Sequence, residues 1–235
     1  MAFGVYWTLT PYLCGTLKTA PRAEKEYLRP TGQNQEMNNF NELGLAPDIL
    51  HAISDLGFEE PTPIQEKIIP AILTSDKDLT GLAQTGTGKT AGFGLPLLQL
   101  MDVLSGDVQA LILSPTRELG IQISKDIENY AKYLEGFRMV AVYGGADINR
   151  QIRAIKKKPQ IVVGTPGRVL DLIKRKVLKI DKLKWLVLDE ADEMLNMGFK
   201  EDLDSILETT PENKRTFLFS ATMPKEVERI AEKYM

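Results

Sequence analysis

Short apolar runs alternate with amphipathic stretches along most of the chain. From Phe40 onward, six runs of apolar and β-branched residues each lead into a polar loop: Leu79–Ala83, Ala110–Ser114, Met139–Tyr143, Ile161–Gly164, Leu183–Leu188 and Thr216–Ser220. Short runs of this kind predict buried strands. Because the runs are continuously apolar rather than alternating, we expect both faces of their sheet to be covered.

The stretches between these runs have the spacing of helices. Apolar residues recur every three or four positions over Glu118–Leu134, Arg168–Leu178 and Glu201–Glu208. Before the first strand, one helix is predicted over Pro47–Leu56 and a second one after Gln65. Strands separated by helices predict an α/β fold with a mainly parallel central sheet and helices on both faces. Ligands of such sheets bind at the carboxyl ends of the strands.

The first 36 residues lack this regularity. Pro11 interrupts their apolar part, and no basic residue precedes it, which argues against a secretory signal. We therefore expect an atypical extension over residues 1–36, disordered or non-native, with Met37 as an alternative start. Residues 37–235 are then expected to form one domain.

Composition narrows the classes of function. Hydrophobic residues make up 43% of the 235 residues, and the formal net charge is −3, so a nucleic acid would have to bind at a local basic patch. The single cysteine, Cys14, excludes intramolecular disulfides and cysteine-rich metal sites. The single histidine, His51, lies in a helical pattern. No apolar run approaches the roughly 20 residues that span a bilayer, and we expect a cytoplasmic protein.

A glycine-rich loop follows the first run. Its residues are Ala83, Gln84, Thr85, Gly86, Thr87, Gly88, Lys89 and Thr90. Glycines let successive backbone N–H groups point at phosphate oxygens, and the helix that follows adds its positive end. Lys89 provides a cation for the outer phosphates, and the Thr90 hydroxyl is suited to Mg²⁺. The alternative is a plain strand-to-helix turn with an exposed lysine. The position of the loop between a strand and a helix favours a nucleotide site.

An acidic segment follows the run that ends at Leu188. Asp189, Glu190, Asp192 and Glu193 come close together, and carboxylates at the rim of a core are costly unless something pairs with them. Acidic residues also begin helices for electrostatic reasons, which is the simpler explanation. If neighbouring parallel strands carry this segment and the glycine-rich loop, Asp189 faces a metal bound at Thr90. Glu190, pointing elsewhere, is then placed to orient and deprotonate an attacking water.

Several segments together resemble the DEAD-box RNA helicases, over Phe40 to Met235. FEEPTPIQ, which holds Phe58, Pro63 and Gln65, resembles the family's Q motif, and Phe40 has the spacing of its isolated aromatic residue. SPTRELG resembles motif Ia, although Gly120 stands where alanine is usual. DEAD is Asp189 to Asp192, and SAT is Ser220 to Thr222. The resemblance implies a three-layer RecA-like P-loop NTPase domain with ATP and Mg²⁺ as cofactors.

The resemblance also assigns roles to residues. Gln65 would read the adenine edge, Phe40 would pack on adenine, and Lys89, Asp189 and Glu190 would be catalytic, with Thr90 and Asp189 holding Mg²⁺ partly through water. Asp192, Ser220 and Thr222 would couple the ATP site to RNA. RNA would be bound through its backbone, with little sequence preference, by Pro115, Thr116, Arg117, Gly144, Gly145, Thr165, Pro166, Gly167 and Arg168. The runs Lys156–Lys158 and Lys174–Lys176 are interpreted as solvated helix ends.

The expected function is that of the ATP-binding half of an RNA helicase. A second RecA-like domain with arginine fingers is missing after SAT, so this chain, taken as a monomer, should bind nucleotide but hydrolyse ATP poorly. One alternative is a stand-alone RNA- or protein-binding module that uses nucleotide as a switch. Another is a P-loop NTPase that acts on something other than RNA. PTPIQ and TPGR argue against the latter.

Overall fold

The computed structural model describes residues 7–8 and 39–235. The strands are Trp7–Thr8 (β1), Leu79–Leu82 (β2), Ala110–Leu113 (β3), Met139–Val142 (β4), Ile161–Gly164 (β5), Trp185–Leu188 (β6) and Arg215–Ser220 (β7). A 3₁₀ helix, Phe40–Leu43, precedes the helices Pro47–Asp55 (α1), Pro63–Thr74 (α2), Lys89–Leu100 (α3), Arg117–Tyr130 (α4), Ile148–Ile155 (α5), Pro166–Lys174 (α6), Ala191–Asn196 (α7), Lys200–Leu207 (α8) and Lys225–Tyr234 (α9).

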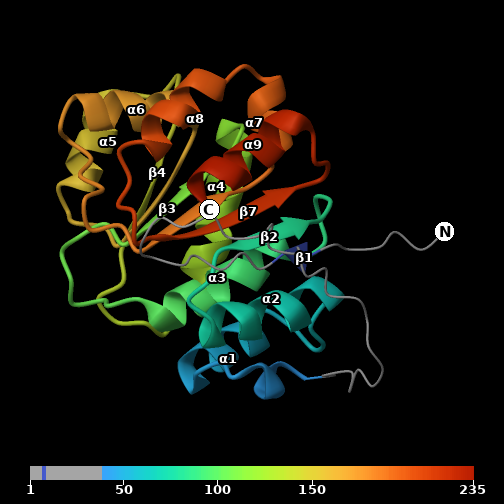
Figure 1. The fold of residues 1–235 in the computed structure, drawn as a ribbon. Helices are drawn as coiled ribbons and strands as arrows, with labels where there is room; N and C mark the ends of the chain where they lie inside the picture. Colours follow the sequence, from blue (N-terminus) through green and yellow to red (C-terminus); the bar gives the residue numbers. More distant parts are fainter. Residues whose placement is uncertain (1–6, 9–38) are drawn as a thin grey trace.

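One sheet organises the domain (Figure 1). Its strand order is β1-β2-β7-β6-β3-β5-β4, and the six strands from β2 to β4 are parallel. The predicted α/β class and mainly parallel sheet are confirmed. β1 pairs antiparallel with β2 at one edge. A strand of two residues has no periodicity, so β1 was not predictable from the apolar pattern. The other residues of the predicted extension over residues 1–36 lie outside the described residues.

Helices cover both faces of the sheet. The buried side chains of α1 to α4 form one apolar cluster with one face of the strands, and those of α5 to α9 form a second cluster with the other face. β3, β5 and β6 are buried along their whole length, which explains why their sequences are continuously apolar. Three layers result.

The predicted helices are present with shifted ends. α2 begins at Pro63, so that Gln65 lies in its first turn rather than before it. α4 ends at Tyr130 instead of Leu134, and α6 ends at Lys174 instead of Leu178. Lys176 follows α6 with a positive φ of 57°, a left-handed conformation that a right-handed helix cannot continue through. Apolar spacing alone therefore predicted too long a helix.

Candidate functional site

The polar loops gather along the carboxyl edge of the sheet in a fixed order. The glycine-rich loop follows β2, Ser220 ends β7, and the acidic segment follows β6. The loops that begin with Pro115, Thr165 and Tyr143 follow β3, β5 and β4, which are neighbours at the other end of the sheet. The structure thus separates the predicted nucleotide residues from the predicted RNA residues. The acidic segment lies between the two groups.

The glycine-rich loop reaches across one strand to the acidic segment. β2 and β6 are not neighbours, because β7 lies between them. Lys89 Nζ nevertheless lies 3.3 Å from Oδ1 of Asp189, and the two residues are only 6% and 2% exposed. The ammonium donates its hydrogen bond to the carbonyl oxygen of Ala83, at 3.2 Å. Lys89 is therefore shared between its own loop and Asp189.

Asp189 has a buried oxygen, Oδ1, which lies 3.3 Å from the ammonium of Lys89. This oxygen accepts no hydrogen bond from any described residue. Burial raises the pKa of the Asp189 carboxyl above its ordinary value, and the nearby ammonium of Lys89 opposes that rise. A buried carboxylate oxygen without a hydrogen-bond donor is costly unless another cation approaches it. Together with the Thr90 hydroxyl in the first turn of α3, this donor set fits a hard divalent cation such as Mg²⁺.

The segment around Gln65 supports the glycine-rich loop from behind. Gln65 Nε2 donates to the carbonyl oxygen of Gly88 at 3.1 Å, and the Thr62 hydroxyl donates to that of Thr87 at 2.9 Å. Gln65 Oε1 accepts from the Thr62 backbone N–H, which ties the start of α2 together. Gly88 has a φ of +89°, and a Cβ there would meet Gln65 Nε2 at 2.5 Å. Only glycine fits this close approach.

The predicted aromatic residues pack on one another. The rings of Phe40 and Phe58 lie 5.9 Å apart, and Phe40 is 4% exposed within the core of the α1–α4 face. Pro63 is the exposed first residue of α2. The structure thus places most of the Phe40 ring inside the core, and its contact with adenine stays a prediction.

Glu190 is held by the glycine-rich loop. The Thr85 hydroxyl donates to Glu190 Oε1 at 2.9 Å. Glu190 has a φ of +55°, a conformation that non-glycine residues adopt at a cost of roughly 1–2 kcal/mol. This turn of the backbone separates Glu190 from Asp189, so the two adjacent carboxylates have different partners: Thr85 and Lys89.

Asp192 connects the acidic segment to the end of β7. The backbone N–H and the hydroxyl of Thr222 donate to Asp192 Oδ2 at 2.9 and 2.7 Å, and the Asp192 N–H donates to Ser220 Oγ at 3.2 Å. Burial would raise the pKa of Asp192, but hydrogen bonds from Thr222, Ser220 and the backbone of Ala221 together outweigh it and hold the pKa below its ordinary value. The DEAD and SAT segments are therefore in direct contact.

Two arginines of the predicted RNA surface have protein partners. The Arg117 guanidinium stacks 4.8 Å from the centre of the Tyr143 ring. Arg168 Nη1 donates to Gln151 Oε1 at 2.9 Å, and its guanidinium also reaches the carbonyl oxygen of Ala146. Arg168 thereby ties the start of α6 to the loop after β4. Both contacts hold the arginines at the carboxyl edge.

The remaining predicted RNA residues lie in the same three loops. The Thr116 hydroxyl accepts from the backbone N–H of Leu119 and so caps α4. Gly144 and Gly145 are exposed, whereas Pro115 and Pro166 are buried and shape their turns. Thr165 and Gly167 are half-buried at the start of α6. The structure therefore brings all the predicted RNA residues to one side of the acidic segment.

A model of the DEAD/DEAH box helicase family matches residues 62–230, which is most of the chain. The chain belongs to the DEAD/DEAH box helicase family. The ATP-dependent RNA helicase CshA of Listeria monocytogenes is 57% identical over 199 residues, which are 85% of this chain and 38% of that protein. CshA of Limosilactobacillus reuteri is 55% identical over 83% of this chain and 39% of its own length. The chain thus spans less than half the length of these curated relatives.

Solved structures of DEAD-box proteins have the same fold. A DEAD box protein of Methanococcus jannaschii matches with a TM-score of 0.80 and 49% identity, over 84% of this chain and 53% of that chain. The RNA helicase Prp28 of Chaetomium thermophilum, bound to ADP, matches with a TM-score of 0.78 and 40% identity, over 86% and 50% of the two chains. The resemblance to DEAD-box helicases and the RecA-like fold are confirmed.

Some residues of this DEAD-box site were not singled out from the sequence. Thr62 stands three residues before Gln65, and this T-x-x-Q spacing is the signature of a capping box, which could have revealed the pair. Tyr143 and Gln151 carry no such signal. Their contacts with Arg117 and Arg168 join separate segments and depend on the tertiary fold.

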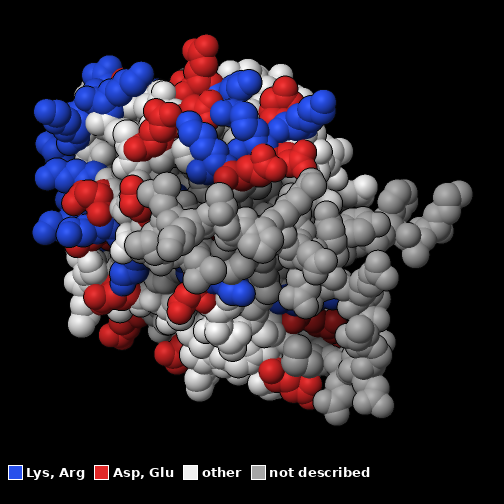
Figure 2. Space-filling view, viewed as in Figure 1, with Lys and Arg blue, Asp and Glu red and all other residues white. Residues whose placement is uncertain are grey.

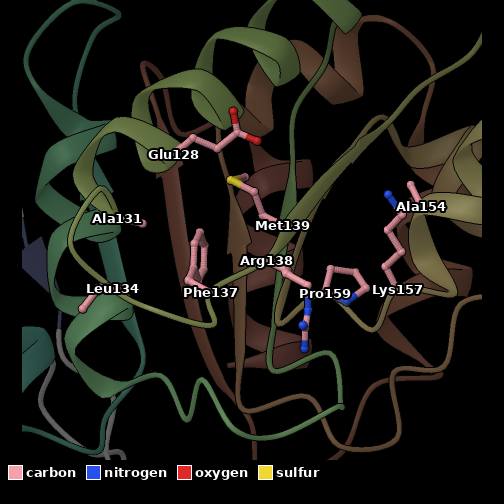
Figure 3. A pocket seen from close by; sticks show the side chains of 9 residues that line it. All are labelled: Glu128, Ala131, Leu134, Phe137, Arg138, Met139, Ala154, Lys157 and Pro159. Carbon is pink, nitrogen blue, oxygen red and sulfur yellow. The ribbon is translucent and has the colours of Figure 1, made fainter.

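The DEAD-box domain also has a cavity away from these loops. A space of about 400 Å³ lies where β4 begins, between the end of α4 and the end of α5 (Figure 3). Leu134 and Phe137 lie on one side of it and Lys157 and Pro159 on the other. None of the predicted site residues lines it.

In the part of the chain that the structure describes, no helix is both long and apolar enough to span a bilayer.

Proposed function

We propose that this chain is the ATP- and RNA-binding half of an RNA helicase, which remodels RNA once it is joined to a second RecA-like domain. The observation that carries the proposal is the buried approach of Lys89 to Asp189 Oδ1, an oxygen that accepts no hydrogen bond from the described residues. Family membership and relatives named as ATP-dependent RNA helicases support it. They also disfavour a stand-alone switch module.

The nucleotide site consists of the glycine-rich loop, the acidic segment and Gln65. Backbone N–H groups from Thr85 to Thr90 bind the phosphates, and Lys89 compensates their negative charge. Thr90 and Asp189, partly through water, hold Mg²⁺, which when bound neutralises charge that develops on the phosphates. Glu190, oriented by Thr85, accepts the proton of the attacking water.

Gln65 selects adenine in this proposal. A glutamine amide has two N–H donors and two acceptor lone pairs, and the hydrogen bonds to Gly88 and Thr62 use one of each. The remaining N–H of Nε2 and the remaining lone pair of Oε1 can bind the edge of adenine, which offers a donor next to an acceptor. Guanine offers a different pattern. Gln65 thus connects recognition of the base to the shape of the phosphate loop.

RNA binds along the carboxyl ends of β3, β5 and β4. Arg117 and Arg168 provide charge, Thr116 and Thr165 provide hydroxyls, and the exposed Gly144–Gly145 turn offers backbone N–H groups. These groups recognise phosphates and sugars, so binding has little sequence preference. Asp192, Ser220 and Thr222 would couple this surface to the nucleotide site, and hydrogen bonds from Thr222 to Asp192 hold the DEAD and SAT segments together for that role.

The nucleotide part is tested by thermal unfolding with Mg-ADP and Mg-GDP. Ligand at 100 times its dissociation constant adds about 2.7 kcal/mol to stability, which raises the melting temperature by roughly 5–10 °C in a domain of this size. Mg-ADP should produce this shift and Mg-GDP a much smaller one. Lys89→Ala should abolish it, whereas Lys67→Ala, an exposed lysine of α2, should preserve it. Each variant is compared with its own ligand-free form.

The outcomes separate the parts of the proposal. Equal shifts with the two nucleotides would remove the role of Gln65, and no shift with either would overturn the ATP site. The RNA part is tested with a short single strand, whose binding should weaken with salt by about 0.7 logarithmic units per phosphate contact for each tenfold rise in salt. Binding that is independent of salt would contradict contacts to the backbone.

A further inference from the structure

Positive charge is concentrated in one segment of an otherwise acidic chain. Residues 150–184 contain twelve lysines and arginines against two aspartates. The other 200 residues contain 17 lysines and arginines against 30 aspartates and glutamates. The basic segment covers most of α5, all of β5 and α6, and the loop to β6. The charge therefore has a definite place in the fold.

The cations lie on two neighbouring helices. α5 and α6 flank each other on one face of the sheet, joined by the Arg168–Gln151 hydrogen bond (Figure 1). Figure 2 shows lysine and arginine side chains gathered over these helices. We define the α5–α6 surface as the cations of residues 150–158 and 174–179, all of which are exposed. These two ranges contain no acidic residue.

Few carboxylates neutralise the α5–α6 surface. Within residues 39–235, two of its cations have a carboxylate within 4.0 Å: Arg150 beside Asp147, at 3.8 Å, and Arg175 beside Asp171, at 2.7 Å. Helix α8, which packs against α6, is acidic, but Asp204 of α8 and Glu208, the residue after it, are already paired with cations of α9. Most of the charge is therefore available to an external anion.

Two lysines of the surface occupy conformations that glycine adopts more easily. Lys158, after α5, has a φ of 59°, and Lys176, after α6, has a φ of 57°. The helix dipole favours cations in a last turn, but it does not account for lysine at a left-handed position, where glycine or asparagine is usual. Lysine is thus present after both helices at a position of positive φ, where its side chain makes the backbone conformation less favourable than glycine would.

The surface is continuous with the proposed RNA loops. α5 begins just after the Gly144–Gly145 turn, and α6 begins at Pro166 of TPGR. From these loops the two helices run away from the carboxyl edge for eight and nine residues, or about 12–14 Å at 1.5 Å per residue. Anything that leaves the loops in this direction passes over the cations.

We propose that RNA longer than the loop site continues over the α5–α6 surface, which binds its phosphates and reads no bases. The inference rests on the proposed function, because the loops place the first part of the strand. Lysine ammonium groups act there as point charges without base preference. Continuity with the loops favours RNA over an acidic protein, which a separate arm of the experiment tests.

The experiment compares oligouridines of six and twenty nucleotides by fluorescence anisotropy over a range of salt concentrations. One variant carries Lys156→Gln, Lys174→Gln and Lys179→Gln. The matched control carries Lys67→Gln, Lys77→Gln and Lys125→Gln, three exposed lysines outside the α5–α6 surface.

The expected results differ between the two RNAs. For the 20-mer, the first variant should reduce the slope of log affinity against log salt by about 2, at about 0.7 per lost phosphate contact. Its binding should then be weaker by roughly a hundredfold at about 0.1 M salt, if the two chains bind equally at about 1 M salt. For the 6-mer, its affinity should stay within about twofold of that of the unmodified chain, since the lysines lie outside the loops. The control variant should leave both RNAs unaffected.

A second variant separates charge from folding. The double substitution Lys158→Gly and Lys176→Gly removes two cations. It also removes the backbone strain of lysine at two positions with positive φ, because glycine adopts this conformation without steric cost. Its melting temperature should be unchanged or higher, and its affinity for the 20-mer should fall. A gain in stability without a loss of 20-mer binding would count against the proposal.

Other outcomes are equally decisive. If the 6-mer binds but the first variant behaves like the control, the α5–α6 surface does not bind RNA and the proposed function still stands. If neither RNA binds in a salt-dependent way, the proposed RNA site itself fails, and this inference with it. If polyglutamate binds in a manner that depends on these lysines and the 20-mer does not, the surface recognises acidic protein instead.

Discussion

The hydroxyl of Thr85 donates a 2.9 Å hydrogen bond to the carboxylate of Glu190, although the glycine-rich loop and the acidic segment follow strands that are not adjacent. One residue earlier, Asp189 approaches Lys89 instead. Two neighbouring carboxylates are thus assigned to different partners by the left-handed turn at Glu190. In the proposed function, this division would let Asp189 face a metal ion and Glu190 face an attacking water.

Glu190→Gln should preserve nucleotide binding and abolish hydrolysis. The amide keeps an oxygen for the Thr85 hydroxyl but cannot accept a proton, and loss of a general base costs about 10²–10⁴-fold in rate. The measurement is ATP turnover in a chain that includes a second RecA-like domain, beside the Mg-ADP thermal shift of this chain. Glu193→Gln, an exposed carboxylate of the same segment, is the control. Normal turnover by Glu190→Gln would show that another group is the base.

Gly88→Ala should destabilise the chain more than Gly86→Ala. Both glycines have φ near +80° to +90°, so alanine at either position costs roughly 1–2 kcal/mol of backbone strain. A Cβ at position 88 would also collide with Gln65 and Thr62, whereas at position 86 nothing lies within 4 Å. We expect a fall of a few degrees in melting temperature for Gly86→Ala and about twice that for Gly88→Ala. Equal effects would mean that Gln65 does not hold the loop.

Thr222→Val should lower stability in a pH-dependent way. The hydroxyl donates to Asp192, whose pKa lies below its ordinary value of 3.8, so the folded chain binds fewer protons there than the unfolded chain. The stabilisation is complete above about pH 3.8 and is lost as the pH falls through the lower folded pKa. At neutral pH the variant should lose roughly 1–1.5 kcal/mol.

The measurement for Thr222→Val is urea unfolding from neutral pH to pH 3. The difference between the two chains should shrink below about pH 3.8. Thr209→Val, whose hydroxyl donates to a backbone carbonyl and to no carboxylate, should show a difference that does not depend on pH. A constant difference for Thr222→Val as well would show that its hydroxyl does not stabilise the charged form of Asp192.

Arg168→Lys should weaken binding of the 6-mer RNA nearly as much as Arg168→Gln. The guanidinium of Arg168 holds Gln151 and the carbonyl oxygen of Ala146 together, and a lysine ammonium cannot reproduce that forked geometry. We expect about a tenfold loss for each variant, from roughly 1–1.5 kcal/mol of lost hydrogen bonding. Anisotropy titrations measure it. If the lysine variant bound RNA normally, Arg168 would act through its charge and not through positioning.

Much of the site was predictable because its signals are local. The glycine-rich loop, DEAD, SAT and TPGR are short segments at or just after the ends of buried strands, and their occurrence together predicts the site, although SAT or TPGR alone is a weak signal. The helix ends were less predictable. Lys176, after α6, has a left-handed backbone conformation that prevents the helix from continuing, and a lysine does not predict such a conformation.

The sequence by itself determined the α/β class, the parallel strands and the family, because apolar periodicity and motif spacing are properties of neighbouring residues. Only the tertiary structure decided that β7 lies between β2 and β6, that Gln65 and Thr62 brace the loop at Gly88, and that Arg168 is tied to Gln151. It also brought scattered lysines together on α5 and α6. These features depend on contacts between residues far apart in the chain, whose formation is governed by packing of the whole domain and not by local preference.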